Sequence, residues 1–228
     1  MEKLPKNNEM VTAQIATLPN RVDLLKKTVE SLLPQVDILN IMLNGHNITP
    51  SFCHKPKITV YHRNNEKGDA EKFFGLKNIE GYIFTCDDDL IYPPDYVETM
   101  TKRLAEFGNF VILTNHGRIM QPKPVSSSYA DRIAAYHWRN EAKESVQLDI
   151  GGTGVMAWDS DCFFPDYNRI DKANMADIWV HGFAKEQGIR IMLCPHPAEW
   201  IQYMNPPETI WDYHYLHPEE QTALYNSF

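Results

Sequence analysis

The sequence predicts an α/β protein in which a largely parallel sheet is covered by helices. Three observations lead to this class. Short β-prone runs alternate with helical stripes through the first half, a row of aspartates follows one of these runs, and the chain is long enough for a large core. With 228 residues, of which 43% are apolar and 23% charged, the composition is that of a globular protein. Disordered, collagen-like and coiled-coil chains are excluded.

The first predicted strand and helix lie near the N-terminus. Residues 11–18 (VTAQIATL) form a β-prone run that ends before a Pro-Asn pair. Apolar residues at 3.6-residue spacing then predict an amphipathic helix over 22–33. Asn20 is its predicted N-cap, and Pro34 ends it.

The rest of the first half continues the alternation. A second amphipathic helix is predicted after Pro94, and it ends at Gly108. In parallel α/β sheets, ligands bind beyond the carboxyl ends of the strands, and three aspartates directly follow the run that ends at residue 86. The remaining strands predicted here are 38–43, 58–62, 81–86 and 110–114.

The second half is less regular. Glycines in 151–158 (GGTGVMAW) predict a tight turn that leads into a strand. A helix is predicted over 174–187 with Gly188 at its end, and a strand over 189–194. No repeat or linker interrupts the pattern, so we predict a single domain over residues 1–228.

Charge and cysteine content restrict the function classes. The net charge of −8 and pI of about 5.6 disfavour general nucleic-acid binding, which depends on Lys and Arg. The four cysteines form no C-x-x-C pair, which indicates buried thiols in a reducing compartment. The polar N-terminus does not resemble a signal peptide, and no run of 18 apolar residues predicts a transmembrane segment. We therefore expect a cytoplasmic protein.

Asp87, Asp88 and Asp89 are the sharpest chemical signal. Three adjacent carboxylates repel one another unless a cation or fixed donors offset their charge. Hard oxygen ligands of this kind suit Mg²⁺ or Mn²⁺, with diphosphate oxygens and water completing the coordination. A solvated acidic turn that caps the next helix is the alternative, and the triplet alone does not decide between the two.

The surrounding segments resemble GT-A glycosyltransferases, particularly those of the family 2 type. Residues 82–96 (YIFTCDDDLIYPPDY) are similar to the metal-binding D-x-D segment of these enzymes. Residues 15–21 (IATLPNR) resemble the opening strand that meets the nucleotide base, and 64–72 (NNEKGDAEK) the stretch that lines base and phosphates. Residues 176–180 (ADIWV) resemble the acidic motif that holds the catalytic base. The four segments occur in the family's order.

The resemblance implies a GT-A fold and a metal-dependent sugar transfer. The donor is then a nucleotide sugar, with UDP as the expected nucleotide, and the acceptor is a glycan. Because no transmembrane segment or basic motif of the processive synthases is present, we expect one sugar to be moved per reaction. The resemblance also leads us to expect inversion of configuration. Residues 10–115 correspond to the nucleotide-binding half and 116–228 to the acceptor-side half.

The resemblance also assigns roles to individual residues. Asp177 becomes the catalytic base, and Asp87 and Asp89 become ligands of Mn²⁺ or Mg²⁺. Asp149 is the second candidate for the base, and in many enzymes of this type a late histidine adds a metal ligand. The candidates for that histidine are His196, His214 and His217. The predicted nucleotide-sugar contacts are Thr17, Arg21, Asn44, Asp69, Lys72, Asp87, Asp88 and Gly152.

Departures from the pattern leave two alternatives open. The acidic motif of the family has two adjacent carboxylates, whereas Ala176 precedes Asp177 here. One alternative is a non-catalytic module that binds a glycan or a nucleotide sugar. The other is a sugar-phosphate nucleotidyltransferase, although the opening loop rich in Gly and basic residues that is typical of that class is missing.

Overall fold

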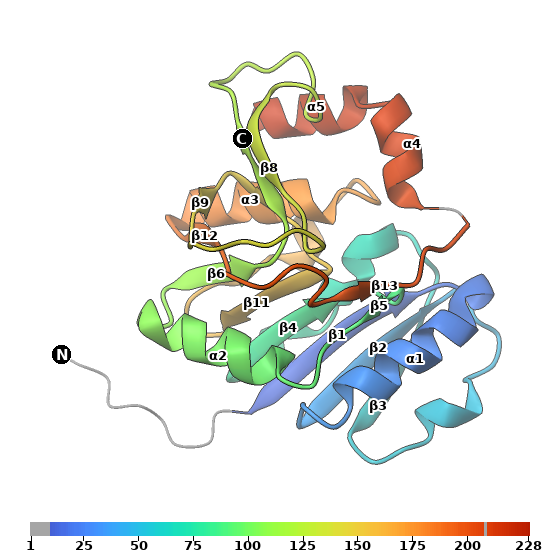
Figure 1. Ribbon diagram of the computed structural model, residues 1–228. Coiled ribbons are helices and arrows are strands. Elements are labelled where there is room, and N and C mark those ends of the chain that lie inside the picture. Colours follow the sequence, from blue (N-terminus) through green and yellow to red (C-terminus); the bar gives the residue numbers. More distant parts are fainter. Residues whose placement is uncertain (1–9, 208) are drawn as a thin grey trace.

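An eight-stranded sheet forms the centre of the molecule (Figure 1). The computed structural model describes residues 10–207 and 209–228. The strands of the sheet, in spatial order, are β3 (Ile58–Arg63), β2 (Ile38–Asn44), β1 (Val11–Thr17), β4 (Tyr82–Cys86), β11 (Val155–Asp159), β6 (Val111–Thr114), β12 (Arg190–Leu193) and β9 (Gln147–Leu148).

Strand directions identify the type of sheet. Strands β3, β2, β1 and β4 are mutually parallel, and β12 is parallel to β6. Strand β11 runs antiparallel between β4 and β6, and β9 is antiparallel at the edge. The order 3-2-1-4 is that of Rossmann-like nucleotide-binding sheets. The predicted α/β class is therefore confirmed.

Helices cover both faces of the sheet, so its central strands are apolar on both sides. Helices α1 (Val22–Leu32) and α2 (Tyr96–Glu106) pack on one face, in front of the sheet in Figure 1. Helix α3 (Ala176–Gln187) packs on the other face. Strand β4 shows the division, because Phe84 and Cys86 join the core under α1 and α2 while Ile83 joins the core under α3.

Smaller elements surround this sheet. Helix α5 (Glu219–Ser227) lies alongside α3 and is at the top of Figure 1. A 3₁₀ turn (Gly68–Phe73) packs against β1 and β2 and contributes two of the predicted site residues. The smaller elements are β5 (Leu90–Ile91), β13 (Gln202–Tyr203), β7 (Gly117–Met120), β8 (Arg132–Tyr136), β10 (Ile150–Gly151), α4 (Ile210–Leu216) and α5 (Glu219–Ser227).

The predicted cap of α1 is wrong. Asn20 belongs to a 3₁₀ turn over Pro19–Arg21, and Arg21 precedes the helix without a side-chain cap bond. The reason is local: Pro19 fixes the first residue of the turn, and the chain then enters the helix through this turn. The end of α3 is as predicted, because Gly188 adopts a left-handed conformation with φ of 68°.

Two predictions about chain chemistry can be compared with the fold. The cysteines at positions 53, 86, 162 and 194 are all unpaired thiols. None of the helices within residues 10–207 and 209–228 combines the length and apolar character needed to cross a membrane.

Candidate functional site

The candidate site lies where β1, β2 and β4 end. Because these strands are parallel, their carboxyl ends meet at one edge, which brings Thr17, Asn44 and the aspartate triplet together from distant parts of the sequence. The antiparallel β11 begins at the same edge, and its preceding turn contains Gly152, Thr153 and Gly154. A site built from several chain segments results.

Asp88 is the buried support of the triplet. Only 4% of the residue is exposed. Thr17 donates a hydrogen bond of 2.6 Å from its hydroxyl to Asp88 Oδ2, and Arg21 donates one of 2.8 Å to Oδ1. Thr28 of α1 donates to the backbone carbonyl of Asp88 at 3.0 Å. The predicted ligand contacts Thr17 and Asp88 are thus hydrogen-bonded to each other. Together they position Asp87 and Asp89.

Asp89 carries charge that its protein partners do not fully compensate. Its side chain is 13% exposed, and Arg21 Nη1 lies 3.3 Å from Oδ2. Burial, followed by repulsion from Asp87 and Asp88, raises the pKa of Asp89 to about 7. A divalent cation beside Asp89 would remove this penalty.

Asp87 is the open member of the triplet, with 43% of its side chain exposed. It forms an ion pair with Lys72, and its backbone N–H donates to the Tyr92 hydroxyl at 2.9 Å. Gly154 packs directly on the carboxylate, since a Cβ built there would lie 1.9 Å from Asp87 Oδ2. Only glycine allows this approach of the turn to the aspartate.

Lys72 joins the triplet to the opposite side of the site. It is 2% exposed and lies in the 3₁₀ turn beside β1. Burial opposes its charge, but the carboxylates of Asp87, Asp69 and Asp177 together raise the pKa of Lys72. One lysine therefore interacts with carboxylates from three separate segments.

Asp69 lies in the 3₁₀ turn Gly68–Phe73, where its side chain contacts the first residue of α3 rather than an open strand end. Its Oδ2 accepts a hydrogen bond from the Ala176 backbone N–H at 3.4 Å, while Oδ1 is buried and has no hydrogen-bond partner. Burial raises the pKa of Asp69 to about 7, and Asp177 and Asp87 contribute to the increase. Asp69 thus joins the 3₁₀ turn to the first residue of α3.

Asp177 is in the first turn of α3 and reaches across to the turn before β11. The backbone N–H and the hydroxyl of Thr153 both donate to Asp177 Oδ1, each at 2.8 Å. Burial raises the pKa of Asp177, while these two bonds and nearby Arg118 oppose the increase. Through these bonds Asp177 connects α3 to the turn before β11. A residue that only caps its own helix would not make this connection.

Asn44 and Gly152 shape the site without presenting side-chain groups to solvent. Asn44 is 2% exposed, and its amide donates to Asn65 Oδ1 at 3.0 Å and to the Gly68 carbonyl at 3.2 Å. It thereby fixes the loop that carries Asp69 and Lys72. A Cβ on Gly152 would lie 2.7 Å from the His116 ring, so the turn there requires glycine.

The residues present fit a divalent cation that is shared with a ligand. Within the two described ranges, no three His, Cys, Asp or Glu side chains are grouped closely enough to hold a metal alone. His196, His214 and His217 therefore complete no such group. Asp87 and Asp89 supply hard oxygen donors and uncompensated charge, which suits Mg²⁺ or Mn²⁺ when phosphate oxygens and water supply the other ligands.

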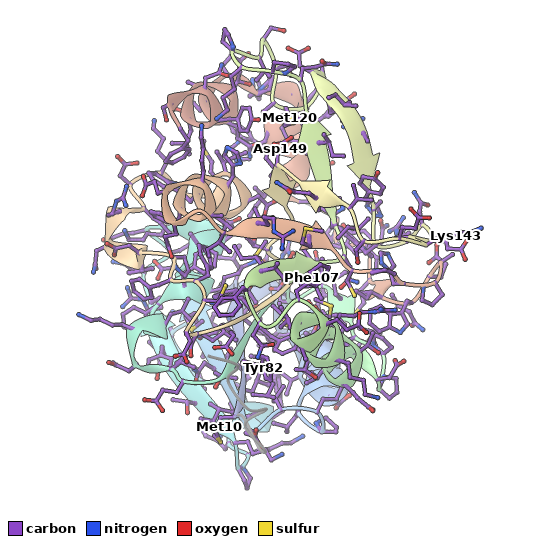
Figure 2. All side chains as sticks on the ribbon, turned by 90° about the vertical axis from the view of Figure 1, so that its left-hand side faces the viewer. Met10, Tyr82, Phe107, Met120, Lys143 and Asp149 are labelled. Atoms are coloured by element: carbon purple, nitrogen blue, oxygen red, sulfur yellow. The ribbon has the colours of Figure 1, made fainter. Side chains whose placement is uncertain are left out.

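Asp149, the second candidate for the base, belongs to a different contact. Its Oδ2 accepts a hydrogen bond of 2.7 Å from the Met120 backbone N–H, and Figure 2 shows the two residues together near the top of the molecule. Its backbone carbonyl lies 2.6 Å from His181 Nδ1. Asp149 thus fixes β7 beside α3.

Two hollows lie apart from the aspartate triplet. One of about 640 Å³ lies between α1 and α2 and is lined by Gln35, Val97 and Trp200 among others. Another of about 550 Å³ lies near Asp149 and His181. Neither of these hollows is lined by the triplet, so chemistry and not volume identifies the candidate site.

Sequence reasoning missed three contributors to this site. Thr28 and Tyr92 hold the backbone of the triplet, but nothing in their sequence context distinguishes them from core residues. Arg118 lies near Asp177 because β7 pairs with β10, a pairing that no local pattern predicts. The glycine-rich turn that contains Gly154 was a usable signal.

Comparison with known proteins adds little to this geometry. Neither a protein-family model nor a curated protein matches the chain. Among solved structures, the chain is similar to a 4-diphosphocytidyl-2C-methyl-D-erythritol synthase from Anaerococcus prevotii, with 11% identity and a TM-score of 0.49. The match covers 96% of this chain and 95% of that one.

Proposed function

We propose that this chain is a metal-dependent glycosyltransferase that moves one sugar from a nucleoside diphosphate, with UDP as the expected nucleotide, to a glycan acceptor. One observation carries the proposal: Lys72 interacts with Asp87 from the end of β4 and with Asp177 from the start of α3. One lysine therefore interacts with two carboxylates, Asp87 on the proposed donor side of the reaction and Asp177 on the proposed acceptor side.

The donor side would use the triplet and its cations. Asp87 and Asp89 would hold Mn²⁺ or Mg²⁺, and the bound ion would neutralise negative charge on the diphosphate. Arg21 keeps Asp88 and Asp89 in place through hydrogen bonds of 2.8 and 3.3 Å. The vacant acceptor on Asp69 Oδ1 suits an N–H group such as that of uracil.

The acceptor side would use Asp177. A general base must lie within hydrogen-bond reach of the attacking hydroxyl, and it works best when its pKa is close to the operating pH. Burial raises the pKa of Asp177 toward that range. In an inverting transfer, this carboxylate takes the proton as the hydroxyl oxygen bonds to the anomeric carbon and the diphosphate leaves.

Two other functions remain to be separated by experiment. A sugar-phosphate nucleotidyltransferase would release pyrophosphate rather than UDP, and the solved structure described above is named for the synthesis of a diphosphocytidyl compound. In this chain the segment after β1 is the short 3₁₀ turn Pro19–Arg21, which contains no glycine. A non-catalytic module would bind nucleotide sugars without turnover.

The direct test measures which product is released. The protein is incubated with Mn²⁺, a panel of UDP-sugars and glycan acceptors, and in parallel with CTP or UTP and sugar phosphates. We expect UDP release that depends on the acceptor, and no pyrophosphate. Asp177→Asn should lower transfer by roughly 10²–10⁴-fold. Asp149→Asn is the matched control and should retain activity.

The other outcomes are equally specific. Release of pyrophosphate assigns the nucleotidyltransferase function. Binding of UDP-sugars without release of either product, across the panel, supports the non-catalytic module. If transfer survives in Asp177→Asn and collapses in Asp149→Asn, the base has been assigned to the wrong aspartate.

A further inference from the structure

Arg118 is a partly buried cation beside the proposed base. It lies on β7 and pairs with Ile150 of β10. The turn that follows β10 contains Thr153, which donates a hydrogen bond to Asp177. Arg118 and Asp177 interact electrostatically, yet no ion pair joins the guanidinium to a carboxylate anywhere in the described chain. The carboxylate of Asp177 instead accepts two hydrogen bonds from Thr153.

The Arg118 guanidinium is held by Tyr129, which hydrogen-bonds to it and packs its ring against it. Its central carbon lies 4.6 Å from the centre of the Tyr129 ring, which is a cation–π contact. Arg132 on the neighbouring β8 adds a second positive charge. Burial lowers the pKa of Arg118, whereas Tyr129 and Asp177 oppose this decrease.

A buried polar atom without a partner belongs to a residue that contacts the same Tyr129. Gln221 of α5 is 6% exposed and hydrogen-bonds Tyr129, while its Oε1 has no hydrogen-bond partner. Buried polar groups in folded proteins are normally paired, so the unpaired Oε1, which Tyr129 connects to Arg118, marks a candidate ligand contact. The ring of Tyr215 on α4 lies 6.1 Å from that of Tyr129 and extends the same wall.

We propose that Arg118, with Tyr129 and Gln221, binds an anionic oxygen group, a carboxylate or a phosphate, on the acceptor whose hydroxyl Asp177 deprotonates. A guanidinium forms two parallel hydrogen bonds with either group, and Gln221 can accept a bond from a neighbouring hydroxyl. This inference rests on the proposed function for the role of Asp177. It deepens that function by naming the class of acceptor, an acidic or phosphorylated sugar.

The test is a binding titration of the protein without donor or metal. Glucuronate, glucose 6-phosphate and neutral glucose are titrated and followed by ligand-observed NMR. We expect at least one of the two anionic sugars to bind roughly tenfold or more tightly than glucose, and Arg118→Gln to remove that preference. Arg132→Gln is the matched control, since Arg132 is exposed, and it should keep the preference.

Two further variants make the outcome decisive. Arg118→Lys retains the charge but not the two parallel bonds, so it should weaken the preference even where Arg118→Gln does not fold. Asp177→Asn removes a competing negative charge and should tighten binding of the anionic sugar. A purely structural Arg118 would show neither effect.

The results separate this inference from the proposed function. Equal affinity for all three sugars, no binding of any, or a preference that survives in both Arg118 variants overturns the acceptor assignment. Preference for glucuronate alone assigns a carboxylate, and preference for glucose 6-phosphate alone assigns a phosphate. Because the titration needs no turnover, it can succeed even where the transfer assay fails, and the reverse also holds.

Discussion

Lys72 shows how a single side chain holds the candidate site together. It is almost fully buried, forms an ion pair with Asp87, and interacts with Asp69 and Asp177. A buried charge is tolerated when it is paired, but removal of one partner leaves the others uncompensated. The lysine therefore stabilises the fold and keeps several carboxylates close together.

Substitution of Lys72 should reveal both roles. Lys72→Met should lower the free energy of unfolding by about 1–3 kcal/mol, a range kept modest because Asp87 is exposed and can be solvated. Urea unfolding measures the change, and Lys102→Met, which breaks an exposed ion pair on α2, is the control with a much smaller expected change. Equal effects of the two substitutions would contradict the account.

Gly154 should be essential for the position of Asp87. In Gly154→Ala the new methyl group would overlap Asp87 Oδ2, so the aspartate or the turn must shift. We expect binding of UDP with Mn²⁺ to weaken roughly tenfold or more, measured by calorimetry. Gly188→Ala is the control. It strains a left-handed residue with open space around it, and it should reduce stability without affecting binding.

At the scale of elements, His181 joins α3 to its neighbours. The residue is 8% exposed and packs on Tyr225 of α5, with a ring-centre distance of 4.8 Å. Its Nδ1 lies 2.6 Å from the Asp149 carbonyl, and Lys123 and Lys185 lie nearby. Burial lowers the pKa of His181 to about 4. The folded protein therefore keeps this ring neutral.

The sign of the pH dependence follows from that shift. In the unfolded chain His181 binds a proton below about pH 6.5, whereas in the folded protein it does so only near pH 4. Its contribution to stability is thus full above pH 6.5 and is lost as the pH falls toward 4, by up to about 1.4 kcal/mol per pH unit.

Thermal unfolding of the wild type and of His181→Gln across this range checks the prediction. The melting temperature of the variant should fall less steeply on acidification. The difference between the two proteins isolates His181 from Asp69 and Asp89, whose raised pKa values give the opposite trend. Parallel curves for the two proteins would show that His181 does not titrate in this way.

The elements that the sequence predicts are those whose local signals agree. Strands β1, β2 and β4 combine β-prone runs with sharp ends, and Gly188 ends α3 as expected. Helices α4 and α5 escaped prediction because their aromatic and polar residues follow no clear stripe, although Thr209 and Asp212 form a capping box. The apolar spacing that predicts a helix is weakest in elements that pack against the core through only a few residues.

The candidate site was partly predictable for the same reason. The aspartate triplet stands out because adjacent carboxylates need compensation, and the order of the motifs adds Lys72 and Asp177, whose roles stay predictions. The role of Arg118 depends on a pairing between β7 and β10, and that of Thr28 on how α1 packs. Such tertiary relations leave no periodic trace in the sequence.

For the whole molecule, the parallel sheet is what gathers the chemistry. Strands from the first half end at the triplet, while β11 and α3 from the second half bring Gly154 and Asp177 to the same edge. The chain carries a net charge of −8, yet its site holds Arg21, Lys72 and Arg118. Local cations in an acidic protein favour a compact anionic ligand over a nucleic acid.

The central claim is that Asp87 and Asp89 bind a divalent cation together with a nucleoside diphosphate. Calorimetric titration of UDP into the protein, with Mn²⁺ and then with chelator, tests it most directly. The account predicts that UDP binds roughly tenfold or more tightly with Mn²⁺, and that Asp89→Asn abolishes this difference while the far-UV circular dichroism is unchanged. Equal UDP affinity with and without the metal would contradict it.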